Sequence, residues 1–336
     1  MGLLRYIAVR ALLIIPTILI LYTLVFIVLR ILPGNPVIAA IGTKNIPQEQ
    51  LEALMRELGL DKPLYVQYFE YLFNVLRGDF GTSMIIRGRS ITLDILERLP
   101  ATIELSVSSL IVSLVIGIIA GFGVAVKKDT KIDTSMRIFG AITYTLFIPW
   151  LGLLFQLVFA KWLGVLPVSG RIDPGIELET VTGFYILDSI ITGNTEALIS
   201  ALEHLVLPSL TLGLVLSGPY VRLVRANMIK QLESNYILAY MARGVRDWKV
   251  KYYAFRNALI PVVTYAGLQF ALLLGGAVLT ETTFDWPGIG TYLVEKVNYR
   301  DYPAVQAVVI VFAFFVGLIS LIVDLIYALL DPRIRY

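Results

Sequence analysis

The stretch Tyr236–Pro261, YILAYMARGVRDWKVKYYAFRNALIP, decides how this chain is organised, because it is the longest polar interruption among the later apolar runs. Six basic residues lie between positions 229 and 261, against two acidic ones. A segment this basic between two membrane spans is expected on the cytoplasmic side. Apart from Gly244 it is built from helix-compatible residues up to Pro261. The stretch therefore predicts a helical docking surface for a cytoplasmic partner.

The composition around this stretch is that of a membrane protein. Of 336 residues, 57% are hydrophobic and 16% are charged, and the mean hydropathy is +0.77. Soluble domains carry about a quarter charged residues. The net charge of +3 is small and the basic residues cluster by loop, so nucleic acid is not an expected partner.

The sequence offers no site for chemistry of its own. There is no cysteine, which excludes disulfides, thiolate nucleophiles and metal sites with cysteine ligands. The single histidine, His204, leaves little for a metal or acid–base site built on histidine. The phosphate-binding pattern GxxxxGK[ST] is absent, and no carboxylate pair or Ser/His/Asp set has a catalytic spacing. We expect no catalytic, cofactor or metal site. If the protein moves a solute uphill, another polypeptide must supply the energy.

Six apolar runs are long enough to cross a bilayer core of ~30 Å as helices. They cover residues 11–32, 101–126, 138–158, 205–223, 259–279 and 304–330. The first run is followed by LPGNP instead of a small-residue cleavage site, which favours an uncleaved span over a signal peptide. Pro149 predicts a kink in the third run. The predicted fold class is an all-α membrane protein.

Loop charges give the expected sidedness. Basic residues precede the first run and fill the loop after the second, whereas the loop 162–203 carries one basic residue against six acidic ones. Under the positive-inside rule both termini are cytoplasmic and loop 162–203 is outside. The expected units are the first transmembrane helix (1–32), an extracytoplasmic insertion with short helices (33–100) and a five-helix core (101–336). The core includes the cytoplasmic loop 229–258.

Ionisable residues within the apolar runs are few. Glu104 and Lys161 stand at outer ends, where an interfacial position is expected. Asp324 stands deeper in the last run; it either faces a water-filled pathway or pairs with a basic residue such as Arg333. The polar residues Tyr144, Gln156 and Gln269 either line a translocation path or pack between helices.

Several short motifs together resemble one family. The segment ARG at 242–244, followed by RNALIP at 256–261, is similar to the cytoplasmic loop motif of ATP-binding-cassette importer permeases. The rest of the chain resembles the first of the two permeases of the oligopeptide/dipeptide importers. The matching motifs, in the family's order, are LPGNP at 32–36, LGLDKPLYVQYFEYL at 58–72, GDFGTS at 78–83, RLPATIELS at 98–106, LPVSGR at 166–171, HLVLPSLTLGL at 204–214, WPGIG at 286–290, RDYP at 300–303 and DPRIRY at 331–336.

The resemblance implies a function and partners. It implies a multi-pass permease of the cell (plasma or inner) membrane that pairs with a second, homologous permease as a heterodimer. Two cytoplasmic ATPases bind ATP and Mg²⁺, and an extracytoplasmic binding protein delivers the substrate. The cytoplasmic motif becomes a coupling helix seated in the ATPase. Its core falls on Ala239, Tyr240, Met241, Ala242, Arg243 and Gly244.

Two features depart from the family pattern, and two other functions stay open. Tyr240 stands where a small residue is common, and the interval from Gly244 to Pro261 is one residue shorter than expected. Import of oligosaccharides by the same type of machine is one alternative. An ion-coupled carrier or channel acting alone is the other, although the scarcity of deep charges and the basic loop disfavour it.

Overall fold

The structure is a computed structural model that describes residues 3–31, 49, 52, 55–56, 59–86 and 88–330. Within those ranges every regular element is a helix, and the sole β feature is the isolated bridge between Thr82 and Ser90. The all-α class is therefore confirmed. The LPGNP and DPRIRY motifs, with Arg333, and most of residues 32–58 of the expected insertion lie outside the described residues.

Five helices in the described part of the chain are long and apolar enough to cross a membrane, or six if one bent pair counts as a span. The single spans are α1 (Leu3–Ile31), α5 (Ile91–Val126), α9 (Thr195–Leu232) and α15 (Tyr302–Leu330), and a further span joins α11 (Asp247–Ala258) to α12 (Ile260–Gly276). The bent pair is α6 (Lys131–Thr145) with α7 (Ile148–Phe155) and the π-helix η1 (Gln156–Trp162).

The third span is broken rather than kinked. Helices α6 and α7 meet at an angle of 102°. Leu146 and Phe147 between them have extended backbones, and Pro149 stands in the first turn of α7. A proline there lacks an N–H that would have no helical partner anyway, so Pro149 starts a new helix instead of bending an old one. The prediction of a kink within one helix is therefore wrong, because Pro149 stands at the start of a second helix.

Helices α5 and α9 form the central pair of the bundle. With 36 and 38 residues, they are each longer than 50 Å at about 1.5 Å per residue, well beyond a bilayer core. Small residues let their backbones approach closely: a Cβ on Gly121 would lie 2.7 Å from Cβ of Val224, and one on Gly213 would lie 2.6 Å from Val112. Such contacts replace the hydrophobic driving force that lipid removes.

Short helices occupy segments that the sequence presents as loops. Residues 281–303, expected as a short outer loop, contain the second half of α13 (Val278–Thr283) and all of α14 (Ile289–Asn298). The acidic loop contains α8 (Tyr185–Ile191). Helix α4 (Leu64–Leu76) lies in the insertion before α5, where short helices were expected. The turn-like motifs WPGIG and RDYP stand at the two ends of α14, and its apolar face is short. The sequence therefore did not predict this helix.

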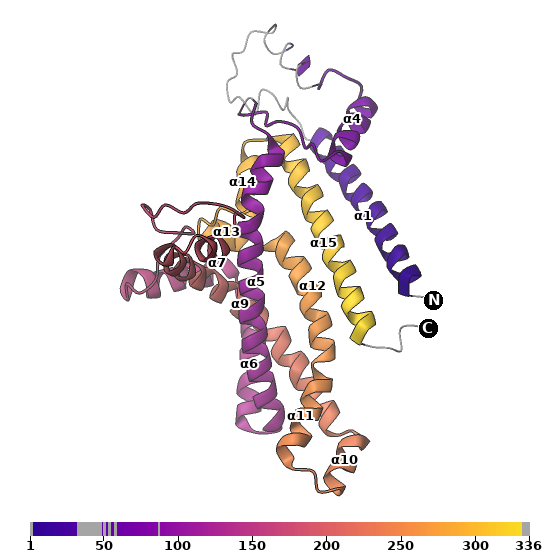
Figure 1. Cartoon of the computed structure of the whole chain (residues 1–336), viewed down its shortest axis with the longest axis vertical. Coiled ribbons are helices and arrows are strands. Elements are labelled where there is room, and N and C mark those ends of the chain that lie inside the picture. Colours follow the sequence, from indigo (N-terminus) through magenta and orange to yellow (C-terminus); the bar gives the residue numbers. More distant parts are fainter. Residues whose placement is uncertain are drawn as a thin grey trace.

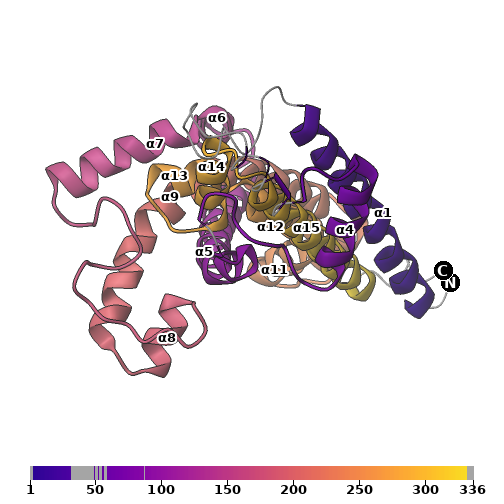
Figure 2. The same ribbon diagram turned by 90° about the horizontal axis from the view of Figure 1, so that it is seen from above.

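Figure 1 shows how these elements are arranged along the long axis. Helices α10 (Asn235–Ala242) and α11 lie at one end, and α4 and α14 lie toward the other. The first turn of α1 and the last turn of α15 lie on the same side of the bundle. Seen from above, α7 and α8 project sideways from the bundle as two separate arms (Figure 2).

Candidate functional site: the surface of helix α10

Helix α10 follows α9 directly after Glu233 and Ser234, and it covers the core of the cytoplasmic motif. Its inward face is fixed by Ile237, which is fully buried. Around Ile237 lies one apolar cluster, formed by residues from α5, α9 and α11: Ala125, Met228, Val250, Ala254 and Ala258. The helix is therefore packed against three long helices and is not a free linker.

Polar and aromatic contacts reinforce this packing. The Tyr236 hydroxyl donates to Gln231 Oε1 at 2.8 Å and accepts from Asn257 Nδ2 at 3.1 Å. The ring of Tyr240 lies 5.3 Å from that of Tyr253 on α11. Tyr240 thus faces a neighbouring helix, which explains how a large residue is accepted where the family motif often has a small one.

Gly244 ends the helix in a Schellman motif. The Gly244 N–H donates to the carbonyl of Met241 at 3.0 Å, and the Val245 N–H donates to that of Tyr240 at 3.1 Å. Gly244 has φ = +73°, the left-handed conformation that this motif requires. A Cβ there would meet no heavy atom within 4 Å, so the constraint on Gly244 is its backbone conformation and not a lack of space.

The outward surface of α10 is open. Ala239, Met241, Ala242, Arg243 and Gly244 are exposed, with Met241 at 49%, while Tyr240 is half-buried. Leu238 on the same helix and Trp248 and Tyr252 on α11 are large side chains that are exposed as well. We call these residues, 238–244 with Trp248 and Tyr252, the α10 surface. It combines apolar side chains with the basic Arg243, a composition common in partner-binding surfaces.

Two further contacts join the elements around α10 at the same end of the molecule. Lys128, just after α5, pairs with Glu233, just before α10, at 2.7 Å. The rings of Phe122 on α5 and Phe255 on α11 meet edge to face at 5.3 Å. The elements that hold α10 are therefore also held to one another.

The four residues considered for a translocation path lie on four separate elements. Tyr144 on α6 is exposed, beneath the Arg222 guanidinium at 5.4 Å from its ring. The Gln156 amide donates to the carbonyls of Val168 and Thr283, both at 3.0 Å. Gln269 on α12 is buried. Gln156 thus ties η1 to α13, and its amide hydrogens are already in use.

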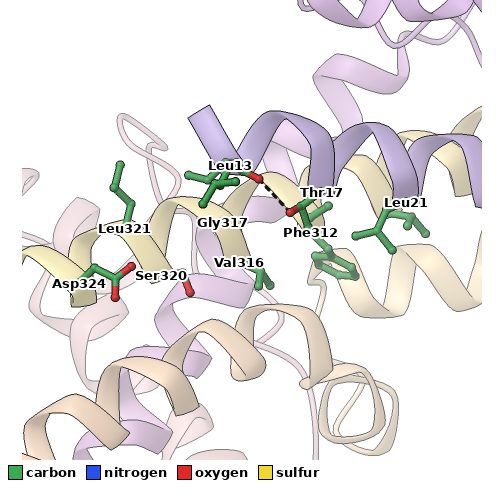
Figure 3. A pocket seen from close by; sticks show the side chains of 12 residues that line it. Leu13, Thr17, Leu21, Phe312, Val316, Gly317, Ser320, Leu321 and Asp324 are labelled. Carbon is green, nitrogen blue, oxygen red and sulfur yellow. Dashed lines mark hydrogen bonds between the residues drawn. The ribbon is translucent and has the colours of Figure 1, made fainter. Parts of the chain in front are cut away.

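Asp324 on α15 lines a cavity that the other three do not line. This cavity, of about 390 Å³, lies between α1 and α15. Leu13, Thr17 and Leu21 of α1 form one wall, and the α15 side chains from Phe312 to Asp324 form the other (Figure 3). The structure does not bring the four residues together into one cavity.

A buried carboxylate at the opposite end escaped the sequence reasoning. Glu281 on α13 is fully buried; its Oε1 accepts from the Thr102 hydroxyl at 2.7 Å, and its Oε2 accepts from the Thr291 N–H at 2.9 Å. Thr102 Oγ1 in turn accepts from the Ile289 N–H at 2.8 Å. Glu281 therefore caps α14 and fastens it to α5, although burial raises the pKa of this carboxyl.

The glycines of WPGIG explain why the carboxylate fits. A Cβ on Gly288 would collide with the Glu281 carboxylate, and one on Gly290 would lie 2.8 Å from its Oε2. Trp286 Nε1 donates to the Ala101 carbonyl at 2.8 Å and closes the same corner. Paired glycines at a helix start were the one available signal for this site.

Glu104 forms a buried ion pair. Its Oε2 lies 2.6 Å from Nη2 of Arg171, and its Oε1 accepts from the Ile186 N–H at 3.0 Å. The Arg171 guanidinium also stacks on the Tyr185 ring at 3.8 Å. Together these contacts fold the acidic loop and α8 back onto α5. The interfacial position of Glu104 stays a prediction, and its pairing with Arg171, 67 residues away, was not predicted.

Nearly the whole chain is similar to known proteins. Residues 113–336 match the family described as binding-protein-dependent transport system inner membrane component, and residues 3–106 match its N-terminal family. The di/tripeptide transport system permease protein of Pseudomonas aeruginosa is 39% identical over 335 residues, 99% of each chain. The dipeptide transport system permease proteins of Alkalihalophilus pseudofirmus (40% identical; 97% of this chain and 98% of the relative) and Escherichia coli K12 (38%; 99% of each) are similar.

These matches run through both halves of the chain and agree with an all-helical bundle of five or six spans. The chain belongs to the family of binding-protein-dependent transport system inner-membrane components, the permease subunits of ATP-binding-cassette importers of the oligopeptide/dipeptide type.

Proposed function

We propose that this chain forms the translocation pathway for di- and oligopeptides in an ATP-driven importer, and that the α10 surface couples it to the ATPase. Members of its family are inner-membrane subunits that work with ATPase and substrate-binding partners. The relatives named above are permeases for di- and tripeptides, which favours peptides over oligosaccharides as substrates.

The observation that carries the coupling role is an anchored helix with an exposed, apolar outer surface. Ile237 and Tyr240 hold α10 against the bundle, while Ala239, Met241 and Ala242 face outward and Arg243 and Gly244 end the helix. A helix that is rigid on one side and open on the other transmits the movement of its socket. On closure of the ATPase pair, we expect the bundle to alternate between outward and inward access.

Other chains supply the energy for transport and complete the importer. Two cytoplasmic ATPases bind ATP and Mg²⁺, and the sequence of this permease has no nucleotide-binding pattern. A second, homologous permease completes the pathway as a heterodimer. The arm of α7 with η1 and the arm of α8 carry exposed apolar residues, including Trp162, Ile190 and Ile191, which suit burial by that partner. Tyr144, Gln156, Gln269 and Asp324 remain candidate pathway residues.

Reconstitution tests this function. The complete importer is placed in liposomes with ATP inside and the binding protein outside, and uptake of a radiolabelled dipeptide is followed. We expect uptake that requires ATP, the ATPases and the binding protein, and no uptake of a trisaccharide. Dipeptide uptake by this permease without the ATPases would favour a carrier or channel and contradict the proposal.

A further inference from the structure

A second site lies between α6 and α9, away from the α10 surface. A cavity of about 600 Å³ opens there, and six residues line it: Thr134, Arg137, Ile138, Ala141, Arg222 and Arg225. Three of the six are arginines, from two different helices. Nothing in the coupling function uses them.

The positive charge of this cavity is only partly compensated. Arg225 makes a two-pronged contact with Asp133, both oxygens lying 2.6 Å from guanidinium nitrogens. The same carboxylate accepts from the Asp129 N–H at 3.1 Å, so its oxygens are occupied. Asp133 also attracts Arg137 through its charge, but among the described residues its only ion pair within 4 Å is with Arg225. The Arg222 guanidinium lies over the Tyr144 ring, 5.4 Å from its centre. The cavity thus carries three arginines against the single carboxylate of Asp133.

The position of the cavity along the bundle indicates from which side an anion would enter. Thr134, one of its lining residues, belongs to the first turn of α6, shortly after the loop that begins with Lys127 and Lys128. That loop is the one expected on the cytoplasmic side. Figure 1 shows α6 in the half of the molecule that also holds α10 and α11. The arginines therefore lie toward the end of the bundle where cytoplasmic headgroups are expected.

The other wall of the cavity is aliphatic. Ile138 and Ala141 line it, and Ile142, 53% exposed, continues the same face along α6. A ligand with a phosphate at one end and a hydrocarbon chain at the other matches both walls. A water-soluble peptide carboxylate would use only the arginines.

We propose that this cavity binds an anionic phospholipid of the cytoplasmic leaflet, with Arg137 and Arg222 holding the headgroup phosphate and the α6 isoleucines bordering an acyl chain. Basic pockets between transmembrane helices on the cytoplasmic side are suited to such headgroups. Guanidinium groups match phosphate geometry better than ammonium groups do.

The test uses the assembled importer, delipidated in neutral detergent, with bound lipid counted by native mass spectrometry. Dioleoyl phosphatidylglycerol is titrated against dioleoyl phosphatidylcholine, in the wild type and in Arg137→Gln/Arg222→Gln. At about fivefold per basic residue, the double variant should bind phosphatidylglycerol about twenty-five-fold more weakly. The matched control, Lys127→Gln/Lys131→Gln, removes the same charge beside the cavity and should keep the wild-type affinity.

Three results would overturn the proposal. Unchanged affinity in the arginine variant would place the lipid elsewhere, and equal losses in both variants would reduce the effect to diffuse surface charge. Displacement of phosphatidylglycerol by a dipeptide, but not by its C-terminal amide, would make the cavity a substrate site. If the arginine variant fails to assemble, Arg137→Lys/Arg222→Lys keeps the charge and should retain the preference for phosphatidylglycerol; its loss there would also contradict the proposal.

Discussion

At the scale of single residues, Gly244 shows how a backbone angle constrains the proposed coupling site. Its φ of +73° costs a residue with a Cβ about 1–2 kcal/mol, but Asn and Asp visit this region more readily. We expect Gly244→Val to disturb the end of α10, and Gly244→Asp to keep the turn while placing a negative charge on the α10 surface. Both should abolish peptide uptake and substrate-stimulated ATP hydrolysis in proteoliposomes.

Gly244→Asn is the matched control, since it has the shape of Asp without the charge. It should retain most uptake, and membrane insertion should be normal in all three variants. Normal uptake by Gly244→Asp would count against a docking role for this surface.

Glu281 gives a second prediction at this scale, about stability. Glu281→Gln replaces one carboxylate oxygen by an amide donor, so either the Thr102 hydroxyl or the Thr291 N–H loses its acceptor, and an unsatisfied buried donor costs about 1–3 kcal/mol. We expect a lower midpoint of thermal unfolding for the purified importer, with Glu281→Ala lower still. Glu203→Gln, at an exposed acidic position, is the control and should unfold like the wild type.

The pH dependence of the same carboxyl has a definite sign. Burial raises the pKa of Glu281 in the folded state, so the folded protein holds this proton more tightly than the unfolded chain does. Its contribution to stability is therefore fully present below the unfolded pKa and declines as the pH rises through the folded one. Thermal unfolding midpoints of the wild type and of Glu281→Ala are compared across that pH range. The variant should lack the part of the pH dependence that Glu281 contributes. Identical pH profiles in the two proteins would argue against the buried environment of Glu281.

At the scale of elements, adjacent residues of α10 separate anchoring from docking. Ile237 is fully buried, whereas Leu238 is 56% exposed. Ile237→Ala should cost about 2–4 kcal/mol of packing and speed amide hydrogen exchange across residues 235–242. Leu238→Ala should leave exchange unchanged in the isolated permease and weaken only its binding to the ATPase. Equal exchange rates in the two variants would show that α10 is not held through Ile237.

The elements also show what the sequence predicts well. Apolar runs of about twenty residues predicted the long helices, because lipid leaves an isolated segment few other ways to satisfy its backbone. Their ends were not predictable: α5 begins at Ile91 and α9 at Thr195, where helical residues are polar and packed against other protein. The break before Pro149 and the helix α14 depend on contacts with α9, α13 and α5, which no local pattern contains.

The residues of the candidate sites likewise include some that the sequence predicts and some that it does not. Gly244 was predictable, since a lone glycine in a helical, basic segment marks a helix end. The Glu104–Arg171 and Glu281–Thr102 contacts were not, because their partners are 67 and 179 residues apart. The three arginines of the α6–α9 cavity were likewise invisible in a list of basic residues.

At the scale of the whole molecule, the α10 surface lies at one end of a helix that crosses the entire bundle. Helix α9 runs without interruption from Thr195, beside α8, to Leu232, next to α10. A displacement of α10 therefore reaches the opposite side through one continuous element. The same arrangement puts the proposed ATPase contact and the Arg171-anchored outer loop at opposite ends of α9.

The most direct test of the coupling claim uses the absence of native cysteines in this chain. Met241→Cys, on the α10 surface, is labelled with benzophenone maleimide in the assembled importer, irradiated, and its cross-linked partner identified by mass spectrometry. Leu187→Cys on α8, with a similar exposure of 50%, is the control. The account predicts an adduct with the ATPase subunit from position 241 and none from position 187. Absence of an ATPase adduct from position 241, in an importer that still takes up peptide, would contradict it.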